Sequence, residues 1–366
     1  MMKTHKAISC ADTFACGFVP RRRLCLSQGV YYTDVDADIV VDLQYGDTGK
    51  GKIAHFLCKT KKYTHILRYN GGCNAGHTVY HHGKKFITHH IPVGVFWGVK
   101  SIIGPGCVVD PEQFFRELKE IEAGGVDTKG LIFIAKNTHI ITQAHKEEDG
   151  KEASIGTTKK GTGPAYRDKY ARVGVRAESV PELSPYLIDM YEEFHTGKEW
   201  TVLGEGAQGF GLDIDWGDYP FVTSSHCTTA GFLTNGFPPQ SVRDVWGVAK
   251  MYETYVGAKK FEPDNPIFKT IRDLGEEFGA TTGRPRQVNW MNVEFLEKAI
   301  HMNGVTHVVF NKIDIMRKAG VWALVVHGKE KTFSTESDMK AYIVERLANV
   351  GIPAPQVYFS ESKDSI

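Results

Sequence analysis

A glycine-rich segment at residues 46–52, with the sequence GDTGKGK, most strongly constrains how this chain can fold. It follows the apolar run 39–43, which predicts a buried strand, and it precedes residues 53–57, which predict the start of a helix. A glycine loop between a strand and a helix leaves backbone N–H groups free at the positive end of the helix dipole. The segment therefore predicts a phosphate-binding site.

This loop departs from an ordinary phosphate loop at its metal ligand. Gly46, Gly51 and Lys52 match the usual spacing, but Ile53 stands where a magnesium-binding Ser or Thr is expected. Asp47, inside the loop, offers a carboxylate that could bind magnesium or act as a base. The sequence therefore predicts phosphate chemistry with an unusual source of metal ligands.

The rest of the chain alternates between strand-like and helical patterns. Apolar runs typical of buried strands lie at 64–67, 101–103, 131–135, 201–203, 245–251 and 307–310. Helical patterns lie at 111–123, 293–301 and 337–350. This alternation favours the α/β class, with a largely parallel central sheet flanked by helices. Together with the glycine loop it predicts a P-loop-related nucleoside triphosphate-binding fold.

The 366 residues suffice for one large domain or two smaller ones. No linker divides the chain after residue 38, so we expect a single catalytic domain over residues 38–366. Residues 1–37 have no sustained period, and we interpret them as a leader. Their arginines also fit a targeting presequence. A third interpretation is a zinc site formed by four loosely spaced potential ligands, His5, Cys10, Cys16 and Cys25.

Charge and cysteine content exclude several classes of protein. The chain has 44 Lys and Arg against 43 Asp and Glu, so it has no overall field to attract nucleic acid or a membrane surface. Seven cysteines without a CxxC pair exclude a complete disulfide framework and favour reduced thiols in the cytoplasm. No apolar run approaches the roughly 18 residues that a membrane span needs. We expect a cytoplasmic protein whose partners are small molecules.

Residues 311–314, with the sequence NKID, give a second nucleotide signal directly after the apolar run 308–310. Asp314 could accept hydrogen bonds from N1–H and the 2-amino group of guanine, while the stem of Lys312 packs on the base. The tetrapeptide alone fits a surface Lys–Asp pair equally well. Combined with the glycine loop, it indicates a nucleoside triphosphate site.

Several further segments together resemble the adenylosuccinate synthetase family. In the family's order they are residues 44–52, 70–78, 155–158, 163–166, 205–209, 213–215, 219–225 and 278–284. The resemblance implies a homodimeric, magnesium-dependent ligase with a P-loop-related fold. Such an enzyme adds L-aspartate to C6 of a 6-oxopurine nucleotide and is driven by cleavage of a nucleoside triphosphate.

The resemblance also implies two catalytic residues. Asp47 resembles the base that removes the N1 proton and that binds magnesium together with the Gly76 carbonyl. His77 resembles the acid that stabilises charge on O6 and on the transferred phosphate. Implied contacts with the triphosphate are made by Thr48, Gly49, Lys50, Gly51, Lys52, His77, Thr78, Lys312 and Asp314.

The other two substrates have implied contacts along the whole chain. Those with the purine monophosphate are Asp47, Asn74, Thr158, Arg172, Gln208, Thr223, Val256 and Arg284. Arg172 resembles an arginine that reaches the neighbouring subunit's substrate, which implies a homodimer with shared sites. L-Aspartate would be bound by Thr282, Arg284 and Arg286, since guanidinium groups suit a carboxylate.

Four departures from the family pattern bear on substrate choice. Thr48 stands where Glu is usual, residues 255–260 (YVGAKK) replace RVGAGP, and Pro285 interrupts an arginine run. Residues 359–363 lack the Ser/Lys-Thr-Gly-Pro loop that helps to enclose the guanine of GTP, although Asp314 is retained. Strict dependence on GTP is therefore not expected.

The departures and the short chain resemble a phage branch that makes 2-aminoadenylosuccinate from dGMP with ATP-type donors, for diaminopurine DNA. We hypothesise that Thr48 gives room, or removes a repulsion, near a 2-amino group. In this hypothesis dGMP, L-aspartate and ATP or dATP would give 2-amino-2′-deoxyadenylosuccinate in the host cytoplasm. The alternative is an ordinary synthetase that uses IMP and GTP for AMP biosynthesis.

Two other classes explain less of the sequence. A GTPase-type switch would use the glycine loop and residues 311–314, but it would not explain residues 74–78 (NAGHT), 206–209 (GAQG) or 281–286 (TTGRPR). A catalytically dead module would be expected to lose Asp47 or His77, and both are present. The ligase is the better interpretation.

Overall fold

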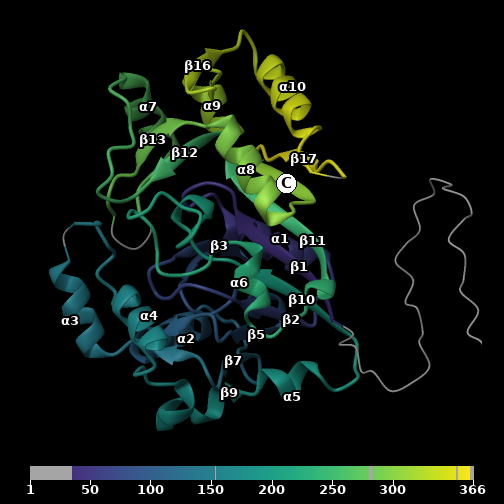
Figure 1. The fold of residues 1–366 in the computed structure, drawn as a ribbon. Coiled ribbons are helices and arrows are strands. Elements are labelled where there is room, and N and C mark those ends of the chain that lie inside the picture. The colour runs from purple at the N-terminus through teal and green to yellow at the C-terminus, as the bar shows by residue number, and fades with distance from the viewer. Residues whose placement is uncertain (1–34, 153, 280–282, 352, 363–366) are drawn as a thin grey trace, which may run out of the picture. The chain divides into compact units, whose positions relative to one another are not determined.

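The computed structural model describes residues 35–362, apart from residues 153, 280–282 and 352 (Figure 1). The expected leader therefore lies outside the described residues, except for residues 35–37, and so does Thr282. In the described part, nine parallel strands form the central sheet. From one edge of the sheet to the other, with neighbours hydrogen-bonded to each other, they are β17 (Gln356–Phe359), β14 (His307–Asn311), β11 (Val242–Lys250), β1 (Val35–Asp42), β10 (Trp200–Glu205), β2 (His65–Arg68), β5 (Lys100–Ile103), β7 (Ile132–Ala135) and β9 (Leu187–Ile188).

The remaining described strands form four small pairs. Three pairs are antiparallel: β3 (His77–His81) with β4 (Lys84–Thr88), β12 (Tyr252–Tyr255) with β13 (Gln287–Trp290), and β15 (Ala323–Val326) with β16 (Lys329–Thr332). The fourth pair, β6 (Val108–Val109) with β8 (His139–Ile140), is parallel. The pair β3–β4 matters most for function, because it begins at His77.

Helices connect the strands of the central sheet (Figure 1). The α-helices are α1 (Lys50–Thr60), α2 (Pro111–Ala123), α3 (Gln143–Lys151), α4 (Thr162–Ala171), α5 (Met190–Phe194), α6 (Thr229–Leu233), α7 (Pro266–Gly275), α8 (Val293–Asn303), α9 (Ile313–Ala319) and α10 (Glu336–Leu347). The 3-10 helices are η1 (Val93–Trp97), η2 (Ala177–Ser179), η3 (Pro181–Tyr186), η4 (Phe210–Leu212) and η5 (Pro239–Ser241). None of the helices among the described residues has the length and apolar character needed to cross a membrane.

Two hydrophobic cores lie on opposite faces of the sheet. In β14, Val308 belongs to the first core and Val309 to the second. Since successive side chains of a strand point to opposite faces, both faces must be covered. Leu296 of α8 packs into the first core and Ile53 of α1 into the second. This double burial explains why the strands read as apolar runs rather than as alternating patterns.

The predicted α/β class with a large parallel sheet is confirmed, with small changes at element ends. Helix α2 has the expected bounds, because Pro111 occupies its first turn and the Asp110 side chain accepts a hydrogen bond from the Glu112 N–H. Strand β1 begins at Val35, inside the segment expected to be leader, because Val35 is buried and pairs with Trp200. Helix α1 begins three residues before the expected start.

Candidate active site

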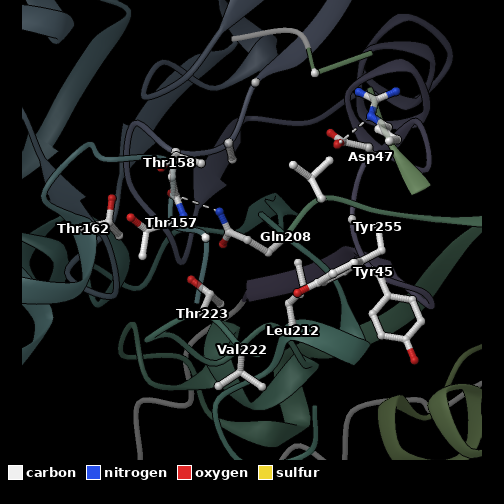
Figure 2. Close-up of a pocket in the computed structure, with 18 of the residues that line it drawn as sticks. Tyr45, Asp47, Thr157, Thr158, Thr162, Gln208, Leu212, Val222, Thr223 and Tyr255 are labelled. Atoms are coloured by element: carbon white, nitrogen blue, oxygen red, sulfur yellow. Dashed lines mark hydrogen bonds and ion pairs between the residues drawn. The ribbon is translucent and has the colours of Figure 1, made fainter. Parts of the chain in front are cut away.

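A cavity of about 880 Å³ lies at the carboxyl ends of the central strands (Figure 2). Asp47 follows β1, Gln208 follows β10 and Lys312 follows β14, and all three line the cavity. This edge of an open parallel sheet is where α/β proteins usually bind ligands. The expected site residues that line the cavity are Asp47, Gly49, Lys50, Gly51, Asn74, Gly76, His77, Thr78, Thr158, Gln208, Thr223, Val256, Arg286 and Lys312.

The glycine loop enters α1 through Gly49, which has a φ of 102°. This left-handed conformation is open to glycine at little cost. Space is also limiting, because a Cβ atom on Gly49 would lie 2.7 Å from Nδ2 of Asn311. The same Asn311 nitrogen donates a hydrogen bond to the Thr48 carbonyl at 2.8 Å. The first residue of the NKID segment thus fastens the glycine loop, a role that the sequence did not indicate.

The loop is organised around Asp42, the last residue of β1, which is buried. Its Oδ1 accepts hydrogen bonds from the backbone N–H groups of Gln44 at 2.9 Å and Gly46 at 3.2 Å. Its Oδ2 accepts from the Thr48 hydroxyl at 2.5 Å and from Lys50 Nζ at 3.0 Å. Sequence reasoning missed Asp42 as a site residue. Its position at the end of a strand, directly before a glycine loop, was the available signal.

The orientation of Thr48 corrects one expectation. Its side chain is buried against Asp42 and does not line the cavity. Asp47 has a φ of 56°, and this backbone turn leaves the Asp47 side chain exposed while the Thr48 side chain is buried. The hypothesis that Thr48 makes room beside a purine 2-amino group is therefore not supported. Lys50 does line the cavity, although its Nζ is held by Asp42 and by the Gln208 carbonyl.

Arg286 connects Asp47 to a buried ionic network. Its Nε lies 3.1 Å from Oδ2 of Asp47, and its NH1 lies 2.6 Å from Oε2 of Glu277. Lys250 Nζ is 2.9 Å from the same Glu277 oxygen, and Lys312 Nζ is 4.0 Å from the other. Burial tends to raise the pKa of Glu277, but the charges of Lys250 and Arg286 outweigh burial and lower the pKa to about 2. Burial lowers the pKa of Lys250 to about 8.

His77 is held by two buried charged residues. Its Nδ1 is hydrogen-bonded to Oε1 of Glu205, and NH1 of Arg68 lies 3.0 Å from its Nε2. The other Glu205 oxygen accepts a hydrogen bond from the Val93 N–H at 2.9 Å. Burial and the Arg68 charge lower the pKa of His77 to about 4, so the imidazole of the free enzyme is neutral near pH 7. Glu205 lies in one of the motifs, but its contact with His77 was not anticipated.

A polar pair forms another part of the cavity wall. Gln208 Nε2 donates a hydrogen bond to Oδ1 of Asn74 at 3.1 Å. Gln208 Oε1 is buried and has no hydrogen-bond partner in the described structure. Figure 2 shows Gln208 and Thr223 among the side chains that line the cavity. An unpaired amide oxygen at a cavity wall leaves an acceptor open to a ligand.

Besides Thr48, two further expected triphosphate contacts lie outside the cavity wall. Lys52 donates hydrogen bonds to Oδ1 of Asn311 at 3.1 Å and to the Ser362 carbonyl at 2.7 Å. Asp314 lies in the first turn of α9, and its carboxylate is 3.8 Å from Lys318 Nζ. The structure therefore brings Lys312, but not Lys52 or Asp314, to the cavity.

Two expected arginines are also outside the wall. Arg284 is exposed, and its NH2 donates a hydrogen bond to the Thr157 carbonyl at 2.9 Å. Arg172 ends α4 with a φ of 64° and is exposed between Tyr170, which is 66% exposed, and Val173, which is 70% exposed. Arg284 thus lies next to a cavity loop, whereas Arg172 belongs to an outer surface.

Comparison with known proteins identifies the family. The sequence model described as "Adenylosuccinate synthetase" matches residues 39–182 and 177–327. The adenylosuccinate synthetase of Chlorobium limicola is 37% identical over 337 residues, which cover 76% of this chain and 77% of the relative. That of Deinococcus radiodurans is 37% identical over 328 residues, which cover 76% and 80%.

Solved structures agree with this result. Fully ligated adenylosuccinate synthetase from Plasmodium falciparum superposes with a TM-score of 0.78 at 25% identity, covering 90% of this chain and 98% of the other. The succinoaminodeoxyadenylate synthetase of cyanophage S-2L, bound to dGMP and dATP, gives a TM-score of 0.65 at 22% identity, covering 85% and 99%. The second likeness shows the fold alone. The chain belongs to the adenylosuccinate synthetase family of carbon–nitrogen ligases.

Proposed function

We propose that this enzyme joins L-aspartate to C6 of a 6-oxopurine nucleoside 5′-monophosphate through a 6-phosphoryl intermediate. One observation carries the proposal: a single cavity is lined by the phosphate loop, the Asp47 carboxylate, the His77 imidazole and the Gln208–Asn74 pair. A phosphate site beside a potential base and a potential acid is what activation of a poor oxygen leaving group requires. A nucleotide switch would need only the first of these.

Asp47 supplies the base in this reaction. Arg286 occupies its Oδ2, and the exposed side chain offers the second oxygen to the N1 proton of the purine. Removal of that proton makes O6 a nucleophile, which attacks the γ-phosphorus of the triphosphate and releases the nucleoside diphosphate. The amine of L-aspartate then attacks C6, and the bond from C6 to the phosphorylated oxygen breaks to release phosphate.

Magnesium fits the donors at this end of the cavity. The Asp47 carboxylate and the Gly76 carbonyl would hold it, because both residues line the cavity and oxygen atoms are its preferred ligands. When bound, magnesium neutralises negative charge on the triphosphate.

His77 acts as the acid toward O6 and the transferred phosphate. In the free enzyme it is neutral, for the reasons given above. Bound phosphate groups bring negative charge to the cavity, and a nearby negative charge favours the protonated imidazole. Glu205 stabilises that cation through its contact with Nδ1.

The other contacts follow from where the residues lie. We assign L-aspartate to Arg284, Arg286 and Thr282, and the triphosphate to the glycine loop with Lys312. Arg284 already holds the Thr157 carbonyl, next to the proposed monophosphate contact Thr158. We also propose a homodimer, because the family resemblance assigns Arg172 a contact across the subunit interface and Arg172 lies on the surface near two exposed apolar side chains, Tyr170 and Val173. Arg172 would reach the partner's substrate across that interface.

For the acceptor, we propose dGMP with ATP or dATP as the donor. Thr48 in place of Glu leaves Asp47 as the loop carboxylate that lines the cavity, so the loop carries less negative charge than the family pattern. The cyanophage enzyme with the same fold was solved bound to dGMP and to dATP as an energy donor. The bacterial relatives at 37% identity favour a second candidate, the ordinary synthetase with IMP and GTP.

One product assay separates these functions. The purified protein with L-aspartate and magnesium is offered dGMP, GMP or IMP, each with ATP, dATP or GTP, and products are identified by mass spectrometry. We expect 2-amino-2′-deoxyadenylosuccinate from dGMP with an adenine donor. Turnover of IMP alone would overturn the dGMP proposal and leave the ligase. Triphosphate hydrolysis without any adduct would favour a nucleotide switch.

A further inference from the structure

Lys259 lies in a cage of three aromatic rings behind the cavity wall. Its Nζ is 4.7 Å from the ring centroid of Tyr45 and 5.2 Å from those of Tyr255 and Phe261. The ammonium group also pairs with Asp218, and 22% of the Lys259 side chain is exposed. Attraction between a cation and aromatic faces strengthens when the cation is partly desolvated, as here.

The cage joins three segments that are distant in sequence. Tyr45 immediately precedes the glycine loop, and its hydroxyl donates to Oδ2 of Asp218 at 2.9 Å. Asp218 belongs to the loop that continues to Thr223, and Tyr255 immediately precedes Val256. Tyr45, Tyr255, Val256 and Thr223 all line the cavity. Figure 2 shows the two tyrosines side by side, and their centroids are 6.0 Å apart.

We propose that Lys259 is a positioning residue that sets the affinity for the purine monophosphate. This inference rests on the proposed function. The three segments carry Asp47, Thr223 and Val256, which are proposed contacts of that nucleotide, and Lys259 fixes their spacing through Tyr45, Asp218 and Tyr255. The glycine loop is also the proposed triphosphate site. That part of the loop is held by Asp42 and Asn311, independently of Lys259.

Lys259 is a feature of this chain rather than of the family pattern. It stands where the family sequence RVGAGP has its second glycine, which has no side chain to reach Tyr45. Its partner Asp218 is 41% exposed and can be solvated by water when the ammonium group is removed. Removal of the charge should therefore loosen the wall without unfolding the protein.

The test compares Lys259→Met, which keeps the apolar stem, with Lys259→Arg, which keeps the charge. Lys260→Met is the matched control, because Lys260 is exposed on the same loop. Steady-state kinetics are measured with whichever of dGMP, GMP or IMP the parent enzyme converts. We expect Lys259→Met to raise the KM for that monophosphate about tenfold, with kcat and the KM for the triphosphate within about twofold. Lys259→Arg should restore most of the affinity, and Lys260→Met should match the parent.

Equal increases in the KM for both nucleotides, or no change in either, would overturn the inference. A lower melting temperature for Lys259→Met without a change in KM would show a purely structural role and would also overturn it. If the parent enzyme forms no adduct, the proposed function fails, and calorimetric binding of dGMP and IMP to the parent and Lys259→Met still decides the inference. Equal dissociation constants, or no binding to either protein, would then contradict it.

Discussion

The two walls of the cavity are held together in different ways. The sheet wall, which bears Lys50 and His77, is backed by charged groups at the ends of β1, β2 and β10. These groups, Asp42, Arg68 and Glu205, are at most 2% exposed.

The loop wall includes Tyr255, Val256, Glu276, Phe278, Gly279 and Arg286. It is more open, since the side chain of Arg286 is 12% exposed and that of Lys259 behind it is 22% exposed. The groups of the sheet wall fix the phosphate loop and His77, whereas the loop wall and its flanking residues bear the proposed purine contacts Val256 and Arg284 and the proposed L-aspartate contact Arg286.

This difference suggests a division of labour. Groups that stabilise a transition state must be fixed before reaction, and burial with charge pairing achieves that. Groups that recognise substrates can lie on loops, which a rigid scaffold positions. Changes in the sheet wall should therefore lower kcat or stability, and changes in the loop wall should mainly raise KM. Asp47 lies where the two walls meet.

The largest effect is expected from Asp47→Asn. An amide cannot accept the N1 proton, so kcat should fall by about a thousandfold or more. The side chain is 38% exposed, so folding should not change. The measurement is kcat at saturating substrates, with thermal melting as the control. Activity within tenfold of the parent enzyme would remove Asp47 as the base.

Glu205→Gln tests the sheet wall itself. The change leaves the buried Arg68 charge without its partner carboxylate, which typically destabilises a protein by about 3–5 kcal/mol. It also removes the negative charge that would stabilise protonated His77, so kcat should fall as well. Urea unfolding gives the first effect and steady-state kinetics the second. A variant as stable as the parent would contradict the view that this wall is held by charge pairing.

Acid should weaken the structure behind the sheet wall through His90. This residue is buried, and its Nε2 accepts a hydrogen bond from the Asp110 N–H at 3.2 Å. Burial lowers its pKa to about 4, whereas the unfolded chain binds the proton near pH 6.5. The free energy of unfolding should therefore fall by about 1–3 kcal/mol as the pH drops from 7 toward 4.

The control for this prediction is His90→Gln, whose side-chain carbonyl can accept the same hydrogen bond. Urea unfolding at several pH values should show a shallower slope for this variant between pH 7 and pH 4. Parallel slopes for parent and variant would mean that His90 does not contribute to the acid sensitivity.

The smallest effect is expected from Arg286→Lys in the loop wall. Lysine keeps the charge but loses the planar fork that contacts Asp47 and Glu277 together. The KM for L-aspartate should rise about tenfold, because a tenfold loss of affinity corresponds to roughly one lost charged hydrogen bond. Thermal stability should change little. A fall in kcat without a change in this KM would place Arg286 functionally in the sheet wall.

The sequence was sufficient for the parts of the molecule that local patterns encode. Apolar runs located seven of the nine described central strands but missed the two edge strands β9 and β17, and the glycine loop placed Asp47 at the cavity. Pairings between distant segments had no such signal: His77 and Glu205 are 128 residues apart, and Asp47 and Arg286 are 239 apart. The buried orientation of Thr48 had no local signal either, because it depends on the positive φ of Asp47 and on the buried Asp42.

The central claim is that O6 of the purine becomes phosphorylated before L-aspartate replaces it. The direct test uses a purine monophosphate labelled with ¹⁸O at C6, together with L-aspartate, magnesium and an unlabelled triphosphate. Phosphate released during turnover is analysed by mass spectrometry. The mechanism predicts one ¹⁸O atom in each phosphate formed with the adduct. Unlabelled phosphate accompanying adduct formation would contradict it.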